Sequence, residues 1–262
     1  MSTLDGSLIR HAAAAACLTL LVTLAAAAQP AAPPEFFSHY DFHLSAAGLK
    51  SDDNRFSWDT HFGGGLDVVD YRVGRASVLI DYEAVLGSEL RAFDPNQGNY
   101  ILEASSSYRA GGTEVAFVFH HVSRHLSDRP KTFAIAWNVV GVRVLRHVAV
   151  GSTMIDVDVD AGGTSQHAHV DYTWVGDANL VARRQLTPRT GVFARGSGHL
   201  MGVDSTLSRH TQSGGAIEGG VRLSGVEGVL ELFAGFERRI DADPFDLQPR
   251  EWFQVGFRLL RH

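Results

Sequence analysis

The chain has 262 residues and a formal net charge of −6, and 45% of its residues are hydrophobic. This acidic balance lacks the basic surface that nucleic-acid binding requires, so we predict no nucleic-acid partner. The only cysteine, Cys17, lies in an N-terminal apolar run. The exported chain therefore has no thiol for a disulfide, a soft metal or a nucleophilic attack.

Residues 1–28 have the features of an export signal, because Arg10 and His11 precede an apolar run that ends in four alanines. The run is short for a transmembrane helix, and its small-residue end is typical of a cleavage site. We therefore predict a cleaved signal peptide over 1–28. Lipid attachment at Cys17 is a disfavoured alternative, because residues 18–24 stay apolar.

A proline-rich lead-in is predicted over 29–34, followed by one domain over 35–262. This domain has no run of about 18 apolar residues that would span a membrane as a helix. Its longest candidate, Phe133–Leu145, is interrupted by Asn138 and Arg143. Apolar and polar residues instead alternate with period two, which is typical of antiparallel strands with one apolar and one polar face.

Alternating segments and turn-forming clusters follow one another along the whole domain. The clearest alternating segments, in chain order, are 39–44, 56–62, 77–82, 113–123, 155–160 and 253–259. Clusters of Gly, Asp, Asn and Pro predict turns at 50–54, 94–98, 110–112, 160–163, 187–189 and 241–249. The intervals between them predict about twelve strands, without a helix or a second domain.

Two all-β architectures fit this pattern: a soluble sandwich or jelly roll, and a closed antiparallel transmembrane β-barrel. Aromatic residues near predicted strand ends favour the barrel, because they would form interfacial girdles; they are Phe36-Phe37, Trp137, Tyr172, Trp174 and Trp252-Phe253. Asp156, Asp158 and Asp160 occupy the polar face of one strand, which suits a wet lumen. We predict a barrel of about twelve strands whose lumen is filled by Arg, Asp, Glu and His side chains, so that a general diffusion pore is not expected.

The segment most suggestive of chemistry is the histidine- and serine-rich end of the strand 113–123. One face of this strand carries Val115, Phe117, Phe119, His121 and Ser123. A histidine and a serine two positions apart point to the same face, the minimum geometry for a base beside a nucleophile. If the bulkier face looks to lipid, both side chains lie on the outer wall, where the substrate would be a lipid acyl ester.

Residues 121–128 resemble the His-x-Ser-x-His-Leu-x-Asp signature of a family of bacterial outer-membrane proteins known only as a domain of unknown function. The chain has Val122, Arg124 and Arg129 where that family usually has Gln, Ser and Glu. The segment Gly235–Phe245 is similar to the same family. This resemblance implies an outer-membrane barrel and assigns no activity.

The same segment resembles outer-membrane phospholipase A, in which His-x-Ser on one strand is completed by the asparagine of a Trp-Asn pair on the next. The chain has Trp137-Asn138 after the intervening loop. The resemblance implies Ser123 as nucleophile, His121 as general base and Asn138 as the group that orients the imidazole. The Asn-Gly that follows the serine in that pattern is Arg124-His125 here.

Strand alternation leads to a conflicting expectation for Asn138. If bulky Ile135 and Trp137 face lipid, Asn138 faces the lumen and cannot reach His121 without a bulge. Asp128, in the loop, would then be a substitute orienting group.

The alternative is that His120, His121 and Ser123 are boundary residues without chemistry, with loop ion pairs among Arg124, Asp128 and Arg129 that contribute little. The first functional prediction is accordingly a structural, binding or narrow-channel barrel. The second is a membrane-embedded acyl hydrolase of the phospholipase or lipid A deacylase type, using Ser123 and His121.

No metal or other cofactor is predicted, although calcium is retained as an activator by analogy with the phospholipase. Zinc is disfavoured because alternation sends His120 and His121 to opposite faces. Asp156, Asp158 and Asp160 are interpreted as a lumen stripe rather than a calcium loop. Predicted partners are outer-membrane lipids, lipopolysaccharide and the barrel-assembly machinery, in the outer membrane of a Gram-negative-type bacterium; the oligomeric state is left open.

Overall fold

The computed structural model describes residues 33–126, 132–207 and 209–261. The predicted signal peptide, most of the proline-rich lead-in and the predicted site residue Asp128 lie outside these described residues. Within the described parts of the chain, no helix is long and apolar enough to cross a membrane.

Every regular element that the structure describes is a β-strand. In chain order the strands are β1 (Glu35–Tyr40), β2 (Phe42–Lys50), β3 (Trp58–Asp70), β4 (Arg75–Gly87), β5 (Asp94–Ala110), β6 (Thr113–Leu126), β7 (Ile135–Val150), β8 (Thr153–Ala168), β9 (Tyr172–Gln185), β10 (Thr190–Val203), β11 (Gln212–Ser224), β12 (Val229–Arg239) and β13 (Arg250–Arg261). Each neighbouring pair in the sheet is antiparallel.

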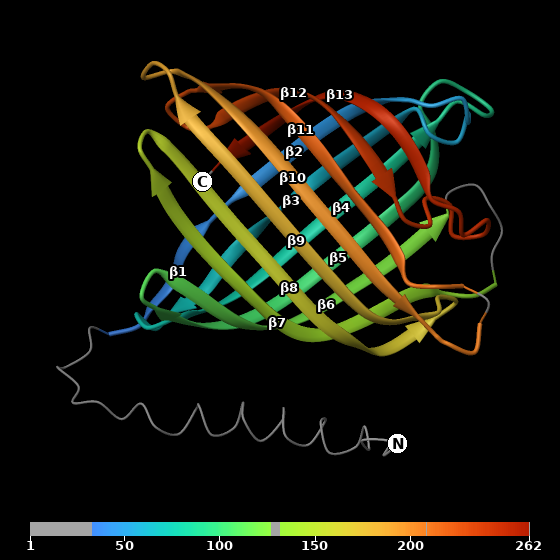
Figure 1. Cartoon of the computed structure of the whole chain (residues 1–262), viewed down its shortest axis with the longest axis horizontal. Coiled ribbons are helices and arrows are strands. Elements are labelled where there is room, and N and C mark those ends of the chain that lie inside the picture. Colours follow the sequence, from blue (N-terminus) through green and yellow to red (C-terminus); the bar gives the residue numbers. More distant parts are fainter. Residues whose placement is uncertain (1–32, 127–131, 208, 262) are drawn as a thin grey trace, which may run out of the picture. The chain divides into compact units, whose positions relative to one another are not determined.

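The sheet closes on itself, because β13 pairs with β2 and β2 pairs with β3, which continues to β4. β1 and β2 both pair with the same edge of β3 and are separated only by Asp41, so together they form one strand of the barrel. The result is the twelve-stranded closed antiparallel barrel seen in Figure 1. The predicted barrel is confirmed, and the soluble sandwich is wrong. Closure gives each of the strands β2–β13 a paired neighbour on both sides, which removes the exposed edges of an open sheet.

The outer wall is apolar because bulky side chains occupy every second position of most strands. On β6, Val115, Phe117 and Phe119 are exposed, whereas the intervening Ala116 and Val118 are buried. The same alternation recurs around the barrel. An outward apolar band over an inward polar face is typical of barrels that stand in a membrane.

The lumen is filled by paired charges. The predicted inward stripe is confirmed: Asp158 and Asp160 lie 3.3 and 3.5 Å from Arg143, and Asp156 pairs with Arg183. Arg143 also pairs with the buried Glu103 on β5. These contacts join the inner faces of β5, β7, β8 and β9 and place paired charges in the lumen.

The predicted aromatic girdle is only partly correct. Trp174 and Phe253 are exposed on the outer wall, as expected. Trp137, Tyr172 and Trp252 are instead buried, with 4%, 1% and 2% of their surface exposed. They face inward and fill apolar clusters in the barrel, so their bulk serves packing rather than contact with an interface.

Two predicted turns are wrong, because residues 94–98 open β5 and residues 160–163 lie within β8. In the first, the amide side chains turn inward: Gln97 is 2% exposed and donates to the carbonyl of Ala242 at 2.6 Å. Polar side chains that find partners in the lumen are compatible with a strand. Three predicted turns are confirmed, because the chain reverses direction at 110–112, 187–189 and 241–249.

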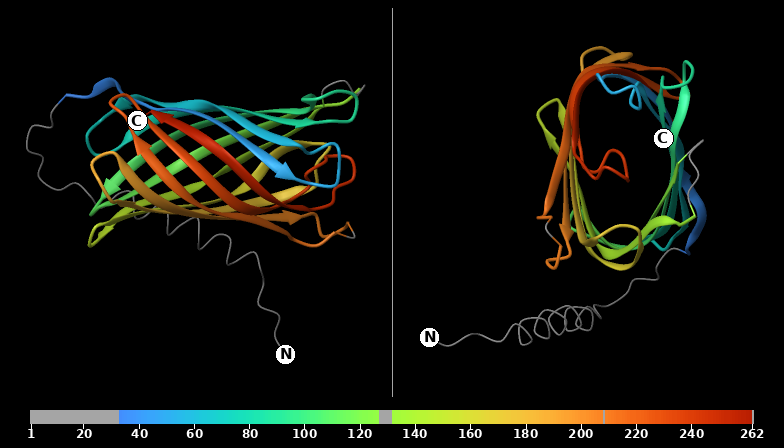
Figure 2. Two further views of the ribbon diagram at one scale, coloured as in Figure 1. Left: turned by 90° about the horizontal axis from the view of Figure 1, so that it is seen from above. Right: turned by 90° about the vertical axis from the view of Figure 1, so that its right-hand side faces the viewer.

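The connection between β12 and β13 folds into the barrel instead of away from it. Viewed along the barrel in Figure 2, this segment lies inside the ring of strands, drawn in red. Asp241 and Asp243 are 0% and 1% exposed. Residues 240–249, called the plug loop below, therefore lie across one end of the lumen.

Partners from several parts of the wall hold the plug loop. Tyr172 donates to the Asp241 carboxylate at 2.6 Å, and Arg209 pairs with the same carboxylate at 2.6 Å. Arg55 donates to Asp243 at 2.8 Å. The charges of this loop are buried only because each is paired and hydrogen-bonded.

Candidate functional site

The candidate site lies on the outer face of β6, near its end at the plug-loop side. Strand register places His121 opposite Asn138 of β7, and Ser123 opposite Ala136. On the other side of β6, Tyr100 of β5 is opposite Ser123. All of these positions belong to the outward face, so the prediction that His121 and Ser123 lie on the outer wall is confirmed by the alternation with buried neighbours on β6.

A hydrogen-bonded chain runs from His121 across two strands. His121 Nδ1 lies 2.5 Å from Asn138 Oδ1, and Asn138 Nδ2 donates to Gln166 Oε1 of β8 at 3.1 Å. With the amide oxygen of Asn138 as acceptor, Nδ1 of His121 carries the proton. In the neutral ring Nε2 then holds the lone pair, which is the tautomer of a general base.

The expectation that Asn138 faces the lumen is wrong. Trp137 is the inward residue, where its ring packs edge-on against Tyr172 at 5.3 Å, beneath the Arg124 guanidinium at 5.4 Å. Asn138 consequently lies on the outer wall without any irregularity in the pairing of β6 with β7. The bulk of Trp137 did not indicate its side, because the lumen at this end is apolar and takes large rings.

The serine and the predicted base are on one face but are not hydrogen-bonded to each other. Ser123 Oγ lies 3.0 Å from Nε2 of His125, two residues further along the strand. Period-two alternation was sufficient to place His125 beside Ser123, and this signal was missed. Gln166 had no local signal at all, because only the register of β8 against β7 brings it to Asn138.

A shallow groove adjoins the site, with a volume of about 520 Å³. Its lining residues are His121, Ala136, Trp137, Asn138, Ser165, Gln166, His167 and Ala168. Ala136 and Ala168 pair with each other next to Ser123, and their small side chains leave the space that forms the groove. The lining carries no carboxylate and no Lys or Arg side chain.

Aromatic side chains lie level with Ser123 on the outer wall. Tyr100 is 47% exposed, and its ring centroid is 5.0 Å from that of Tyr82. The His125 ring contacts Tyr100 edge-on at 5.2 Å. Tyrosines such as these at the end of an apolar wall are typical of the interface between lipid and water.

The histidines of β6 do not form a common metal site. His120 is on the inward face, 3.5 Å from Glu103, whereas His121 faces outward. The predicted separation of these two side chains is confirmed.

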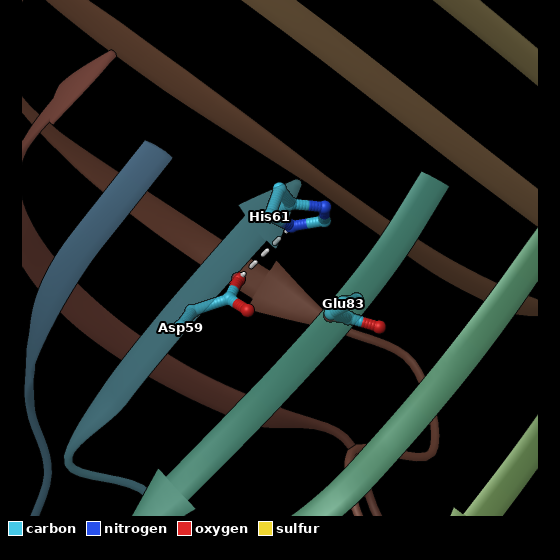
Figure 3. A group of neighbouring side chains, drawn as sticks. All are labelled: Asp59, His61 and Glu83. Carbon is cyan, nitrogen blue, oxygen red and sulfur yellow. Dashed lines mark ion pairs between the residues drawn. The ribbon is translucent and has the colours of Figure 1, made fainter. Parts of the chain in front are cut away.

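A different group in the lumen has metal-ligating residues close together. Ligand atoms of Asp59, His61 and Glu83 lie within 4.8 Å of one another, on the neighbouring strands β3 and β4 (Figure 3). The Arg239 guanidinium contacts Asp59 at 2.5 Å and Glu83 at 2.8 Å. Its positive charge already pairs with both carboxylates, so we interpret the group as an ion-pair network.

No protein-family model matches the chain, and no curated protein matches it. Solved structures do match. Outer membrane phospholipase A from Escherichia coli gives a TM-score of 0.52 at 11% identity, over 85% of this chain and 92% of that chain. The Salmonella typhi phospholipase, a dimer with bound calcium, gives 0.51 at 11% identity over 85% and 90%. An outer-membrane channel from Pseudomonas putida F1 gives 0.56 at 14% identity over 89% and 96%.

These likenesses define a class of protein by its fold: the chain folds as an outer-membrane β-barrel. At 11–14% identity these similarities show the fold alone. Membership of the family of unknown function that residues 121–128 resemble stays a prediction.

Proposed function

We propose that this protein is an outer-membrane acyl hydrolase that cleaves ester bonds of membrane lipids at its outer wall. Ser123 is the nucleophile, His121 a general base and Asn138 the residue that orients its imidazole. The observation that carries the proposal is the 2.5 Å hydrogen bond between His121 and Asn138, on the same outward face as Ser123.

The arrangement has the parts that nucleophilic ester cleavage requires. Ester cleavage by a serine needs a general base, and a catalytic imidazole needs a third group to hold its tautomer and orientation. Asn138 supplies the third group, and Gln166 in turn holds Asn138.

The position of the site supports lipid as the substrate. A soluble ester would have to reach a side chain that points away from the lumen, whereas the ester carbonyls of lipids lie near the interface that Tyr82 and Tyr100 mark. The lining of the groove beside Ser123 has no carboxylate and no Lys or Arg side chain. We therefore expect recognition of the ester and acyl chain with little selection for a charged headgroup, so that phospholipid and lipopolysaccharide are both candidate substrates.

The similarity to the phospholipase supports the same proposal. A solved variant of the Escherichia coli enzyme has an active-site asparagine replaced by alanine, and it matches this chain with a TM-score of 0.53 at 11% identity. An orienting role for Asn138 would parallel that use of asparagine. The Salmonella typhi enzyme has bound calcium, but the groove in this chain offers no carboxylate among its described lining residues. The proposed reaction therefore uses only side chains of this protein.

A narrow-channel function is the second candidate, since the Pseudomonas putida channel shares the fold. The plug loop and the ion pairs of the lumen oppose it, because both occupy the conduction path. We place either function in the outer membrane, after export through the predicted signal peptide and insertion by the barrel-assembly machinery.

The test is fatty-acid release by residues 29–262 refolded into detergent micelles, with phospholipid or lipopolysaccharide as substrate, with and without calcium. We expect Ser123→Ala to lower release to the background rate, because Ser123 Oγ is the proposed site of the acyl intermediate. Ser106→Ala is the matched control, an exposed serine of β5 away from the site, and should keep the wild-type rate. Wild-type release by a heat-modifiable, folded Ser123→Ala barrel would refute the proposal.

A further inference from the structure

Two imidazoles flank the Ser123 hydroxyl, one on each side along β6. His121, Ser123 and His125 are two residues apart in succession and share the outward face. His125 is the one in contact, with its Nε2 3.0 Å from Ser123 Oγ. His121 is held through its Nδ1 by Asn138 instead.

The contact with His125 has the geometry of proton transfer. A distance of 3.0 Å between the hydroxyl oxygen and the ring nitrogen lies within the range that a general base requires. When the serine hydroxyl donates, Nε2 of His125 is the acceptor. The edge-on packing of the His125 ring against Tyr100, with centroids 5.2 Å apart, holds the ring in this orientation.

We propose that His125 is a second catalytic histidine, which accepts the Ser123 proton during acylation while His121 activates water for deacylation. This division of labour rests on the proposed hydrolase function. Two observations support it. The His125 ring contacts the serine hydroxyl, and the hydrogen bond from His121 Nδ1 to Asn138 leaves Nε2 of His121 available.

In acylation, the Ser123 proton passes to Nε2 of His125 as Oγ forms a bond to the ester carbonyl carbon. The tetrahedral intermediate collapses by breaking the bond between that carbon and the alcohol oxygen. The leaving oxygen takes the proton from His125, so that a lysolipid departs and the acyl group stays on Ser123.

In deacylation, Nε2 of His121 takes a proton from water, whose oxygen bonds to the acyl carbon. Collapse of the second intermediate breaks the bond from the acyl carbon to Ser123 Oγ and releases the fatty acid. The proton on His121 returns to Ser123, and both rings end neutral. No oxidant, reductant or metal enters either step.

The two steps are separated by labelling folded barrels with a fluorophosphonate, which reports attack by Ser123, and by measuring lipid-derived acyl-enzyme by mass. We expect His125→Gln to slow labelling about 100-fold or more, the scale of a lost acid–base group. We expect His121→Gln to label within about threefold of wild type, to accumulate acyl-enzyme and to lose turnover. His120→Gln, the same change on the inward face of β6, is the matched control.

The assignment of separate roles to the two histidines would be overturned if His125→Gln is labelled at the wild-type rate and His121→Gln loses labelling. His121 would then be the only base. Failure of the proposed function is a different result: wild type and Ser123→Ala would then label equally. If His125→Gln does not give a heat-modifiable barrel, His125→Asn supplies the same test, because its shorter amide also cannot accept the serine proton.

Discussion

At the scale of single residues, the candidate site depends on one asparagine that faces outward. Asn138 connects His121 to Gln166, and it does so because Trp137 takes the inward position. A residue that acts through the imidazole in this way is a positioning residue. Its loss should lower kcat more than it changes KM, and a residue with a similar acceptor should restore the rate.

We predict that Asn138→Ala lowers kcat for lipid hydrolysis by about 10- to 100-fold with little change in KM, because His121 loses its orientation but the substrate groove remains. Asn138→Asp should restore most of the rate, since a carboxylate also accepts from Nδ1. Equal kcat values for wild type and Asn138→Ala, or an Asn138→Asp variant as slow as Asn138→Ala, would contradict the role.

At the same scale, strand alternation was informative about sides and uninformative about contacts, and the pairing of His121 with Asn138 was implied only by the resemblance to outer-membrane phospholipase A. Val115, Phe117 and Phe119 placed His121 and Ser123 on the outer wall correctly, because side chains alternate strictly along a strand. The side of Asn138 was mispredicted, since large rings fill the lumen here as well as cover the wall. His125 was predictable from the same alternation, and Gln166 was not.

At the scale of elements, the plug loop is the main feature that the alternation of apolar and polar residues did not predict. Its charges bind the loop between β2 and β3: Arg55 contacts Asp53, Asp243 and Asp246. Turn residues at 241–249 predicted a reversal of the chain but not its direction. The direction is decided by partners that arrive from other strands, such as Tyr172 of β9.

These loop contacts predict a pH dependence. Hydrogen bonds from Arg55 hold the pKa of Asp53 below its ordinary value, although burial acts in the opposite direction. Burial raises the pKa of Asp246, but hydrogen bonds from Arg250, the Gln248 backbone and Arg55 outweigh it and lower it. A carboxyl with a lowered pKa stabilises the fold fully above its unfolded value of about 4, and this stabilisation is lost as pH falls through the lowered pKa.

We therefore predict that amide protection of residues 241–247 is constant from pH 7 to pH 5 and falls below about pH 4. Hydrogen exchange, corrected for its intrinsic pH dependence, measures this directly. Arg55→Ala should give the low-pH exchange pattern already at pH 7. Unchanged protection at pH 3 in the wild type would show that these carboxylates do not hold the plug loop.

At the scale of the whole molecule, buried ion pairs across the lumen join strands from the early and late parts of the sequence. Arg239 of β12 contacts Asp59 of β3 and Glu83 of β4, as well as Glu237 on its own strand. Its nearest neighbour, Arg238, points outward and pairs with Glu251 at an exposed position. Two adjacent arginines thus differ in which side of the wall they occupy.

We predict that Arg239→Ala lowers the free energy of unfolding by about 3–5 kcal/mol, because it leaves buried carboxylates without their cation. Arg238→Ala, the matched control, should cost less than about 1 kcal/mol, as exposed pairs contribute little. Denaturant unfolding in micelles, followed by the gel shift of the folded barrel, measures both. Equal losses in the two variants would contradict the structural role assigned to the lumen network.

By itself the sequence determined the two-faced strands, the barrel of about twelve strands and the outward position of His121 and Ser123. These follow from a local rule, the period of two between side chains on one face. The tertiary structure alone decided that Asn138 meets His121, that Gln166 holds Asn138 and that the plug loop turns inward. Such contacts depend on the register between strands and on closure of the sheet, and both are set by pairing between residues distant in the chain.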